Sequence, residues 1–336
     1  MTRTRKPSQT IAVYKAEDLT VVNGANLGDP ISFADELALD DMYELDKGAR
    51  RLPLKIMANA GARFAIAPES TLGEPGAELY FDACLTLMST NGQTTEMLTL
   101  VEVDDTGMVA AVYVMPLVAM KPRLAYSLVG IDRDVAQQRY AEMACVSFTR
   151  GTRITMASGA QRPVEDLQIG DRVLTRDDGA RQLRWIGRST TRAVGEFCPI
   201  LIRAGTLNNA NDLLVSPDHR LFIYQRSDTI GAGRAEILVR ARHLVNGDSV
   251  TRQEGGFVEY VQLLFDTHQI IYAEGIAAET LLVDTRTRAA LPDGIAERLV
   301  SAPEAHAGRA HLDFEIDESL VRDLDAATLL RRASLR

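Results

Sequence analysis

The seven residues Leu167-Gln-Ile-Gly-Asp-Arg-Val173 recur as Leu244-Val-Asn-Gly-Asp-Ser-Val250. Both copies read L-x-x-G-D-x-V, and a Thr follows each copy within two residues. In such a unit Leu anchors a short helical turn, Gly lets the chain reverse, Asp caps the turn and Val opens a strand. Two copies, each before a strand, indicate two related halves of one domain. The alternative interpretation is two unrelated Gly-Asp turns.

The chain on both sides of the first copy is typical of β-structure. After Cys145, short apolar segments alternate with Gly, Asp and Pro, a spacing that favours an all-β fold. Residues 76–130 predict a run of strands, because Asn91-Gly92 between two β-rich segments is a strong hairpin signal. Residues 1–75 look irregular, and residues 131–143 predict a short helix. We therefore expect two parts, a β-rich N-terminal region and a larger all-β domain.

The C-terminal residues 286–336 depart from the β pattern. Apolar residues recur at helical spacing between Phe314 and Leu330, with acidic residues early and Arg331-Arg332 late, an order that the helix dipole favours. We predict a polar tail that ends in a helix. The helix either packs on the preceding domain or mediates self-association.

Composition and charge exclude several classes of protein. The 336 residues are 46% hydrophobic and 25% charged, as in globular proteins. A net charge of -9 argues against nucleic acid as a partner, because phosphate binding needs a basic surface. We expect no membrane span, because no apolar stretch reaches ~20 residues, and no N-terminal signal peptide is visible. A cytoplasmic protein and one secreted by a signal-independent route both stay open.

The three cysteines pose the main chemical question. They are too few for a disulfide framework, and no CxxC pair indicates a zinc site, so we expect no metal and no cofactor. Cys84 falls in a predicted strand and Cys198 matches no motif, so both are predicted to be packing residues. Cys145 stands at the expected domain boundary and is the candidate nucleophile.

Residues 145–285 contain four sequence motifs that are informative in combination. They are Cys145 followed by Gly151-Thr152-Arg-Ile154, the segment Pro163–Thr175, the motif Ser216-x-x-His219, and a closing strand His268–Ile276. Together they resemble the Hint family, the self-processing domain shared by Hedgehog C-terminal regions and inteins, which has Thr-x-x-His where this chain has Ser216-x-x-His219. The resemblance implies a mainly β, horseshoe-like fold with pseudo-twofold symmetry. Residues 1–144 would then be a smaller β-rich passenger and residues 286–336 the tail.

The same residues predict a self-processing reaction. A thiol directly after an amide can attack the preceding carbonyl through a five-membered ring, so Cys145 can take the acyl group of Ala144 as a thioester. His219 is expected to protonate the departing amide nitrogen. The resemblance implies that Ser216 hydrogen-bonds at the scissile Ala144–Cys145 peptide and that His268 assists cleavage or orients Cys145. The substrate is the chain's own N-terminal region, in a single turnover.

Departures from the family limit the outcome. Splicing requires a His-Asn pair at the end of the domain, but this chain has Ala277-Ala278-Glu279-Thr280-Leu281 there, so we expect no splicing. Hedgehog proteins use an acidic residue upstream of Thr-x-x-His to activate an alcohol. The matching region, residues 184–188, has no acid, so cholesterol transfer is poorly supported. Asp218 and Asp266 are candidate substitute bases. The acceptor, either a small nucleophile such as water or a protein, stays open.

Two functions of other classes also remain. One is a catalytically silent Hint-like scaffold that serves as an interaction or structural module and keeps Cys145 buried and unreactive. The other is a thiol hydrolase that acts in trans with Cys145 and His219. The position of Cys145 at the first residue of the domain favours the cis reaction, because a trans enzyme has no reason to place its nucleophile there.

Overall fold

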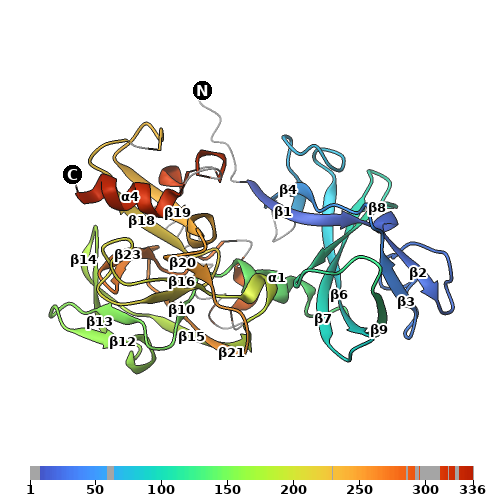
Figure 1. Ribbon diagram of the computed structural model, residues 1–336, viewed down its shortest axis with the longest axis horizontal. Coiled ribbons are helices and arrows are strands. Elements are labelled where there is room, and N and C mark those ends of the chain that lie inside the picture. Colours follow the sequence, from blue (N-terminus) through green and yellow to red (C-terminus); the bar gives the residue numbers. More distant parts are fainter. Residues whose placement is uncertain are drawn as a thin grey trace. The chain divides into compact units, whose positions relative to one another are not determined.

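A computed structural model describes residues 8–58, 64–228, 230–284, 287–291, 295, 311–316, 318–321 and 325–335 of the chain. Two compact units can be distinguished, Met1–Ala141 and Glu142–Arg336 (Figure 1). Both consist mainly of β-strands, which confirms the predicted fold class. Among the described residues, no helix is both long and apolar enough to cross a membrane.

The N-terminal unit is one antiparallel sheet that closes on itself. Its strands are Ser8–Lys15 (β1), Leu19–Asn23 (β2), Met42–Leu45 (β3), Leu52–Ala58 (β4), Phe64–Ile66 (β5), Glu78–Ser89 (β6), Thr94–Val103 (β7), Val109–Pro116 (β8) and Ala125–Asp132 (β9). Six of them follow the order β6-β5-β4-β1-β8-β7, and β7 pairs again with β6. The result is a small barrel, from which β9, β3 and β2 continue as an extension of β6.

For the N-terminal unit, the secondary structure predicted for residues 76–130 is confirmed, whereas the prediction for residues 1–75 needs correction. The predicted run of strands is present as β6 to β9, and the hairpin turns at Gly92, whose φ is 78°. The prediction that residues 1–75 are irregular is wrong, because β1 to β5 lie there. β5 has three residues, all buried, so it shows no alternation. β1 does alternate, with buried Ile11 and Val13 on either side of exposed Ala12, so the pattern of a half-buried strand was present there.

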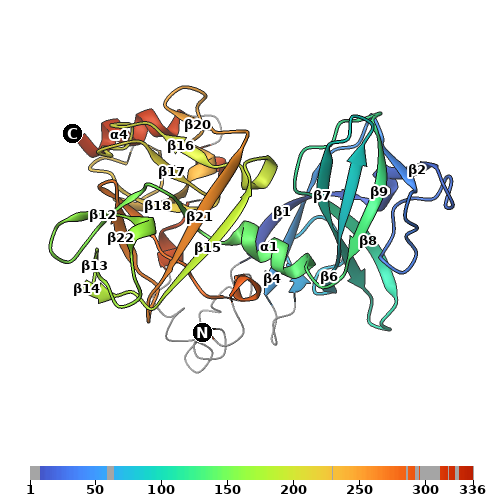
Figure 2. The same ribbon diagram turned by 90° about the horizontal axis from the view of Figure 1, so that it is seen from below.

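The second unit contains two antiparallel sheets. The first follows the order β15-β21-β10-β17-β16-β20, and the second follows β12-β11-β22-β23-β18-β19 with a β13–β14 hairpin attached to β22. The first sheet consists of Trp185–Arg192 (β15), Phe257–Leu264 (β21), Phe148–Thr149 (β10), Leu213–Val215 (β17), Ile200–Ile202 (β16) and Val250–Arg252 (β20). Figure 2 shows its longest pair, β15 and β21, running side by side.

The second sheet consists of Gln161–Pro163 (β12), Arg153–Thr155 (β11), Ile270–Ala273 (β22), Ile276–Glu279 (β23), Arg220–Tyr224 (β18), Glu236–Arg240 (β19), Arg172–Thr175 (β13) and Gly179–Gln182 (β14). Besides short 3-10 helices, the described residues include the α-helices Ala136–Ala144 (α1), as predicted, and Ala326–Leu335 (α4). α1 therefore ends directly before Cys145.

Both copies of the L-x-x-G-D-x-V repeat adopt the same local structure. A short 3-10 helix leads into each copy: Val164–Asp166 ends just before Leu167, and Ala241–Leu244 ends at Leu244. The glycines, Gly170 and Gly247, have φ values of 100° and 77°, in the left-handed region that glycine adopts at no steric cost. The predicted repeat in sequence is therefore also a repeat in backbone conformation.

The outer positions of the repeat anchor it to the core. Both leucines are buried, at 3% and 1% exposure, and both valines are fully buried where the chain enters β13 and β20. The capping differs between the copies. Asp171 accepts from the Gln168 amide in the first, whereas Asn246 accepts from the Asp248 and Val250 amides in the second.

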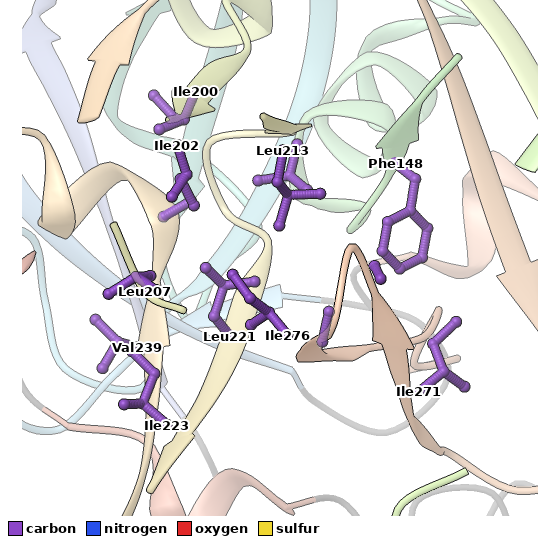
Figure 3. Packing of buried hydrophobic residues seen from close by; sticks show 14 of the residues in the cluster. Phe148, Ile200, Ile202, Leu207, Leu213, Leu221, Ile223, Val239, Ile271 and Ile276 are labelled. Atoms are coloured by element: carbon purple, nitrogen blue, oxygen red, sulfur yellow. The ribbon is translucent and has the colours of Figure 1, made fainter. Parts of the chain in front are cut away.

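The main core of the second unit draws apolar side chains from both sheets (Figure 3). Burying each such side chain contributes about 1.5–3 kcal/mol. The members labelled in the figure are Phe148, Ile200, Ile202, Leu207, Leu213, Leu221, Ile223, Val239, Ile271 and Ile276. The C-terminal helix α4 adds Ala327 and Leu330 to this core and lies against β18. The predicted C-terminal helix therefore packs on the domain.

Candidate functional site

Strand register brings Ser216 to the segment that begins with Cys145. In the β10–β17 pair, Phe148 lies opposite Val215, so the residues just outside that pair, Ser147 and Ser216, also face each other. The Ser216 amide donates to the Ser147 carbonyl at 3.0 Å, and the Ser147 amide donates to Ser216 Oγ at 3.0 Å. Ser216 Oγ in turn donates to the Cys145 carbonyl at 3.3 Å. The hydroxyl therefore holds the peptide units that directly follow the Ala144–Cys145 bond.

A tight turn delivers His219 to the same segment. Residues Ser216-Pro-Asp-His219 form the turn, which the His219 amide closes by donating to the Ser216 carbonyl at 3.0 Å. The imidazole is fully buried. Its Nδ1 lies 3.0 Å from the Ser147 carbonyl oxygen and its Nε2 lies 3.1 Å from the Glu279 carbonyl oxygen. Its ring packs edge-on against Phe148, with centroids 4.5 Å apart.

The two contacts of the His219 ring bear on its protonation. Carbonyl oxygens only accept, so a neutral imidazole, with one N–H, donates to one of them, whereas an imidazolium donates to both. Burial lowers the pKa of His219, while the Glu279 carboxylate and the two carbonyl contacts oppose that shift. The net shift is downward, so the neutral imidazole is favoured, and the two carbonyl contacts would stabilise the imidazolium when a proton is taken up.

Cys145 is enclosed by apolar side chains. It is 1% exposed and packs in a small cluster with Leu264, Leu281, Val283 and Leu291. None of the three cysteines is in a disulfide, and Cys84 and Cys198 are buried, as predicted for packing residues. The Cys145 sulfur is therefore shielded from solvent, while the Ala144 carbonyl is its covalent neighbour along the chain.

A buried carboxylate, Glu279, lies at the centre of the charged groups, and sequence reasoning gave it no role. In the β18–β23 pair Leu221 lies opposite Ala278, which places Arg220 opposite Glu279. Arg220 Nη1 donates to both carboxylate oxygens, at 3.0 and 2.8 Å. Burial raises the pKa of Glu279, but Arg220 and His268 outweigh it and lower that pKa to about 2.

His268, the third predicted site residue, belongs to the same cluster. It is 1% exposed, and its Nε2 lies 3.4 Å from Glu279 Oε2. The pairing of β22 with β23 explains this, since Ile270 lies opposite Glu279 and His268 precedes β22 by two residues. His268 and His219 thus contact different atoms of the same glutamate, one the carboxylate and the other the main-chain carbonyl.

The two candidate bases are both ion-paired. Asp218 is 6% exposed and accepts from Arg240 at 3.0 Å and from Arg242 at 2.9 Å. Burial raises the pKa of Asp218, but the two guanidinium groups outweigh it and lower that pKa to about 2. Asp266 is 68% exposed and accepts a bidentate pair of bonds from Arg184, each 2.9 Å long. Either carboxylate would have to leave an arginine before it could accept a proton.

The C-terminal tail supplies one more charge. Glu315 lies 2.6 Å from Arg240 Nε and 3.2 Å from Arg220 Nε. Arg220 could have been suspected from its place beside His219. The sequence carries no local signal for the strand register that pairs Arg220 with Glu279, nor for the fold of the tail that brings Glu315 to both arginines. In the described part of the chain, no group of three or more His, Cys, Asp or Glu side chains could hold a metal ion.

The chain was also compared with known proteins. The second unit is a mainly β domain with a buried cysteine near its start and two histidines beside a buried glutamate. Residues 146–285 match the sequence model of the Hint domain family, so this part of the chain is a Hint domain. The resemblance of this region to the Hint family is thereby confirmed.

Solved structures and a curated protein are also similar to parts of the chain. The bacterial intein-like domain from Clostridium thermocellum is 13% identical, with a TM-score of 0.30, over 40% of this chain and 97% of that one. The Ssp DnaB mini-intein variant M86 is 10% identical, with a TM-score of 0.29, over 41% of this chain and 97% of its own. A catalytic component of the V-type proton ATPase of Candida tropicalis is 29% identical over 86 residues, which cover 24% of this chain and 8% of that protein.

Proposed function

We propose that the chain cleaves itself at the Ala144–Cys145 peptide bond through an N-to-S acyl shift. The observation that carries this proposal is the way the residues after that bond are held. Ser216 bonds to the Cys145 carbonyl and the Ser147 amide, and His219 bonds to the Ser147 carbonyl, all at 3.0–3.3 Å. A reactive segment fixed at three points loses little further freedom on the way to a cyclic transition state.

The proposed reaction needs no partner in its first step. Cys145 Sγ bonds to the Ala144 carbonyl carbon, the bond from that carbon to the Cys145 nitrogen breaks, and the nitrogen becomes an amine. The thiol gives up one proton and the nitrogen gains one, so the step is an isomerisation. His219 supplies the proton that makes the nitrogen a leaving group. The second step is attack on the thioester by water or another nucleophile, which releases the N-terminal part and restores the Cys145 thiol.

The burial of Cys145 supports a reaction in cis over a hydrolase that acts in trans. Cys145 is 1% exposed, so its sulfur offers no open approach to a separate substrate. The Ala144 carbonyl carbon, by contrast, is bonded directly to the main-chain nitrogen of Cys145. Orientation alone supplies about 7–11 kcal/mol of the barrier in well-placed intramolecular reactions. The reacting group and the substrate are then parts of one chain, and the N-terminal unit is the passenger.

The groups at the end of the domain support cleavage without splicing. Residues 277–281, where splicing relatives need a His-Asn pair, contain neither His nor Asn. Thr280 has no side-chain amide that could cyclise, and its hydroxyl bonds to the Gln269 amide and carbonyl at 3.1 and 3.0 Å. The thioester is therefore resolved by an outside nucleophile, a small molecule or an acceptor protein.

The test is intact mass spectrometry of the purified full chain, with and without hydroxylamine. We expect two fragments that meet between residues 144 and 145, formed faster with hydroxylamine and at a rate independent of protein concentration. Cys145→Ala should form neither fragment. Cys198→Ala removes another buried thiol of the same unit and should cleave like the wild type. If the wild type stays intact for days in hydroxylamine, the proposal fails and a silent scaffold is the remaining interpretation.

A further inference from the structure

The tail segment 311–316 lies outside the residues that match the Hint family and yet contacts the candidate site. Glu315 forms a parallel bridge with Leu238 of β19, and the Ile316 amide donates to the Leu238 carbonyl at 3.1 Å. The same segment brings the His311 ring to 5.7 Å from the His268 ring, measured between centroids. Main-chain pairing therefore fixes this part of the tail against the strands that carry the site.

The carboxylate of Glu315 links two arginines that each hold another buried carboxylate. On one side Arg220 binds Glu315 through Nε and Glu279 through Nη1. On the other side Arg240 binds Glu315 through Nε, at 2.6 Å, and Asp218 through Nη1, at 3.0 Å. Glu315 thus lies between the two ion pairs that flank His219.

Removing the charge of Glu315 would disturb both pairs. Arg220 is 5% exposed and Arg240 is largely buried, so neither can exchange a lost carboxylate for bulk water without moving. A shift of Arg220 moves its partner Glu279. The Glu279 carbonyl faces His219 Nε2 and its carboxylate faces His268 Nε2, so both imidazoles would change their surroundings.

We propose that Glu315 is a positioning residue for the self-processing reaction. It holds Arg220 and Arg240, and through Arg220 it sets Glu279 against His219 and His268. The role in the reaction rests on the proposed function, whereas the effect on the two imidazoles does not. The tail is accordingly part of the processing machinery, although the family match ends at residue 285.

The first measurement is the hydroxylamine-dependent cleavage rate of the full chain. We expect Glu315→Gln to cleave about tenfold more slowly or worse, because the charge-assisted hydrogen bond to Arg240 and the ion pair with Arg220 are lost. Glu315→Asp keeps the charge on a shorter side chain and should recover part of the rate. The matched control is Glu318→Gln, on the same tail with a side chain that is 51% exposed, which should stay within about twofold of the wild type.

The second measurement is nitrogen-15 NMR of the histidine rings in the same full-length proteins, which needs no cleavage. We expect the ring signals of His219 and His268 to shift in Glu315→Gln and to stay unchanged in Glu318→Gln. If the wild type does not cleave, the proposed function fails, and the ring signals alone decide whether Glu315 positions the histidines. If Glu315→Gln does not fold, Glu315→Asp takes its place in both measurements. The proposal is overturned if Glu315→Gln leaves the ring signals of His219 and His268 unchanged, or if Glu315→Gln cleaves at the wild-type rate.

Discussion

Ser216 is the residue whose contribution can be separated most cleanly from the rest of the site. Its hydroxyl donates to the Cys145 carbonyl and accepts from the Ser147 amide, and both groups are buried. Without the hydroxyl, each main-chain group loses a partner, at a cost of about 1–2 kcal/mol to the held conformation. We predict that Ser216→Ala cleaves roughly 5–30-fold more slowly, measured by intact mass against time.

Ser216→Thr is the control for this prediction. Thr keeps the hydroxyl and is the residue that the Hint family has at this position, so the variant should cleave at close to the wild-type rate. Equal rates for the Ala and Thr variants would show that the hydroxyl does not contribute to the reaction.

Asp218 makes the free energy of unfolding of the second unit fall at low pH. Its pKa is about 2 in the folded chain, against 3.8 ordinarily, because Arg240 and Arg242 hold the carboxylate against the effect of burial. A lowered folded-state pKa gives stability that is complete above about pH 4 and is lost as the pH falls through 2. The size is roughly 2 kcal/mol. We predict that Asp218→Asn lowers the free energy of unfolding at pH 7 by at least that amount and flattens its decline between pH 4 and 2.

Trp185 makes this prediction measurable, because it is the chain's single tryptophan and lies in β15 of the second unit. Urea unfolding followed by its fluorescence at pH 7, 4 and 3 gives the free energies. Asp266→Asn is the control, since Asp266 is 68% exposed and should change stability by less than about 1 kcal/mol. An identical acid dependence in wild type and Asp218→Asn would contradict the role of the ion pairs.

Among the elements, the two turns of the repeat depend on glycine for conformation alone. Gly247 has φ of 77°, and a Cβ added there would meet no atom within 4 Å. Gly247→Ala should therefore lose about 1 kcal/mol through backbone strain, while Gly247→Asn should lose less, because Asn tolerates the left-handed region. Trp185 fluorescence in urea measures both. An alanine variant as stable as the wild type would mean that the turn does not need a glycine.

The elements also show what could and could not be predicted from the sequence. The Asn91-Gly92 hairpin and the L-x-x-G-D-x-V repeat carry their signal in adjacent residues, and both were predicted correctly. The strands in residues 8–66 were missed. β5 is buried at all three positions and carries no alternation, whereas β1 does alternate and its pairing with β4 and β8 places it in the sheet. Alternation is therefore informative for a strand such as β1 and absent from a three-residue buried strand such as β5.

The residues of the candidate site also fall into those that the sequence predicted and those that it did not. Cys145, Ser216, His219 and His268 were selected from motifs, and the structure places the last three around Ser147 and Glu279. Glu279, Arg220 and Glu315 were not selected. Their meeting depends on the register of β18 with β23 and on the tail's pairing with Leu238, and neither can be read from neighbouring residues.

At the scale of the molecule, the C-terminal helix is part of the core of the second unit. Leu330 of α4 is fully buried in the same cluster as Leu221 and Ile276. Leu330→Ala should lower the free energy of unfolding by about 2–5 kcal/mol, since it leaves a cavity in that cluster. Arg332→Ala, at an exposed position of the same helix, should change it by less than about 0.5 kcal/mol. Equal stabilities by Trp185 fluorescence would mean that the helix does not support the fold.

The central claim is that Cys145 takes the acyl group of Ala144. The measurement that tests it most directly is tandem mass spectrometry of the N-terminal fragment released by hydroxylamine, because hydroxylamine converts a thioester into a hydroxamate. The account predicts a fragment that ends at Ala144 with a hydroxamate on its terminal carbonyl, paired with a fragment that begins at Cys145. A fragment that ends at another residue, or the same fragment released from Cys145→Ala, would contradict it.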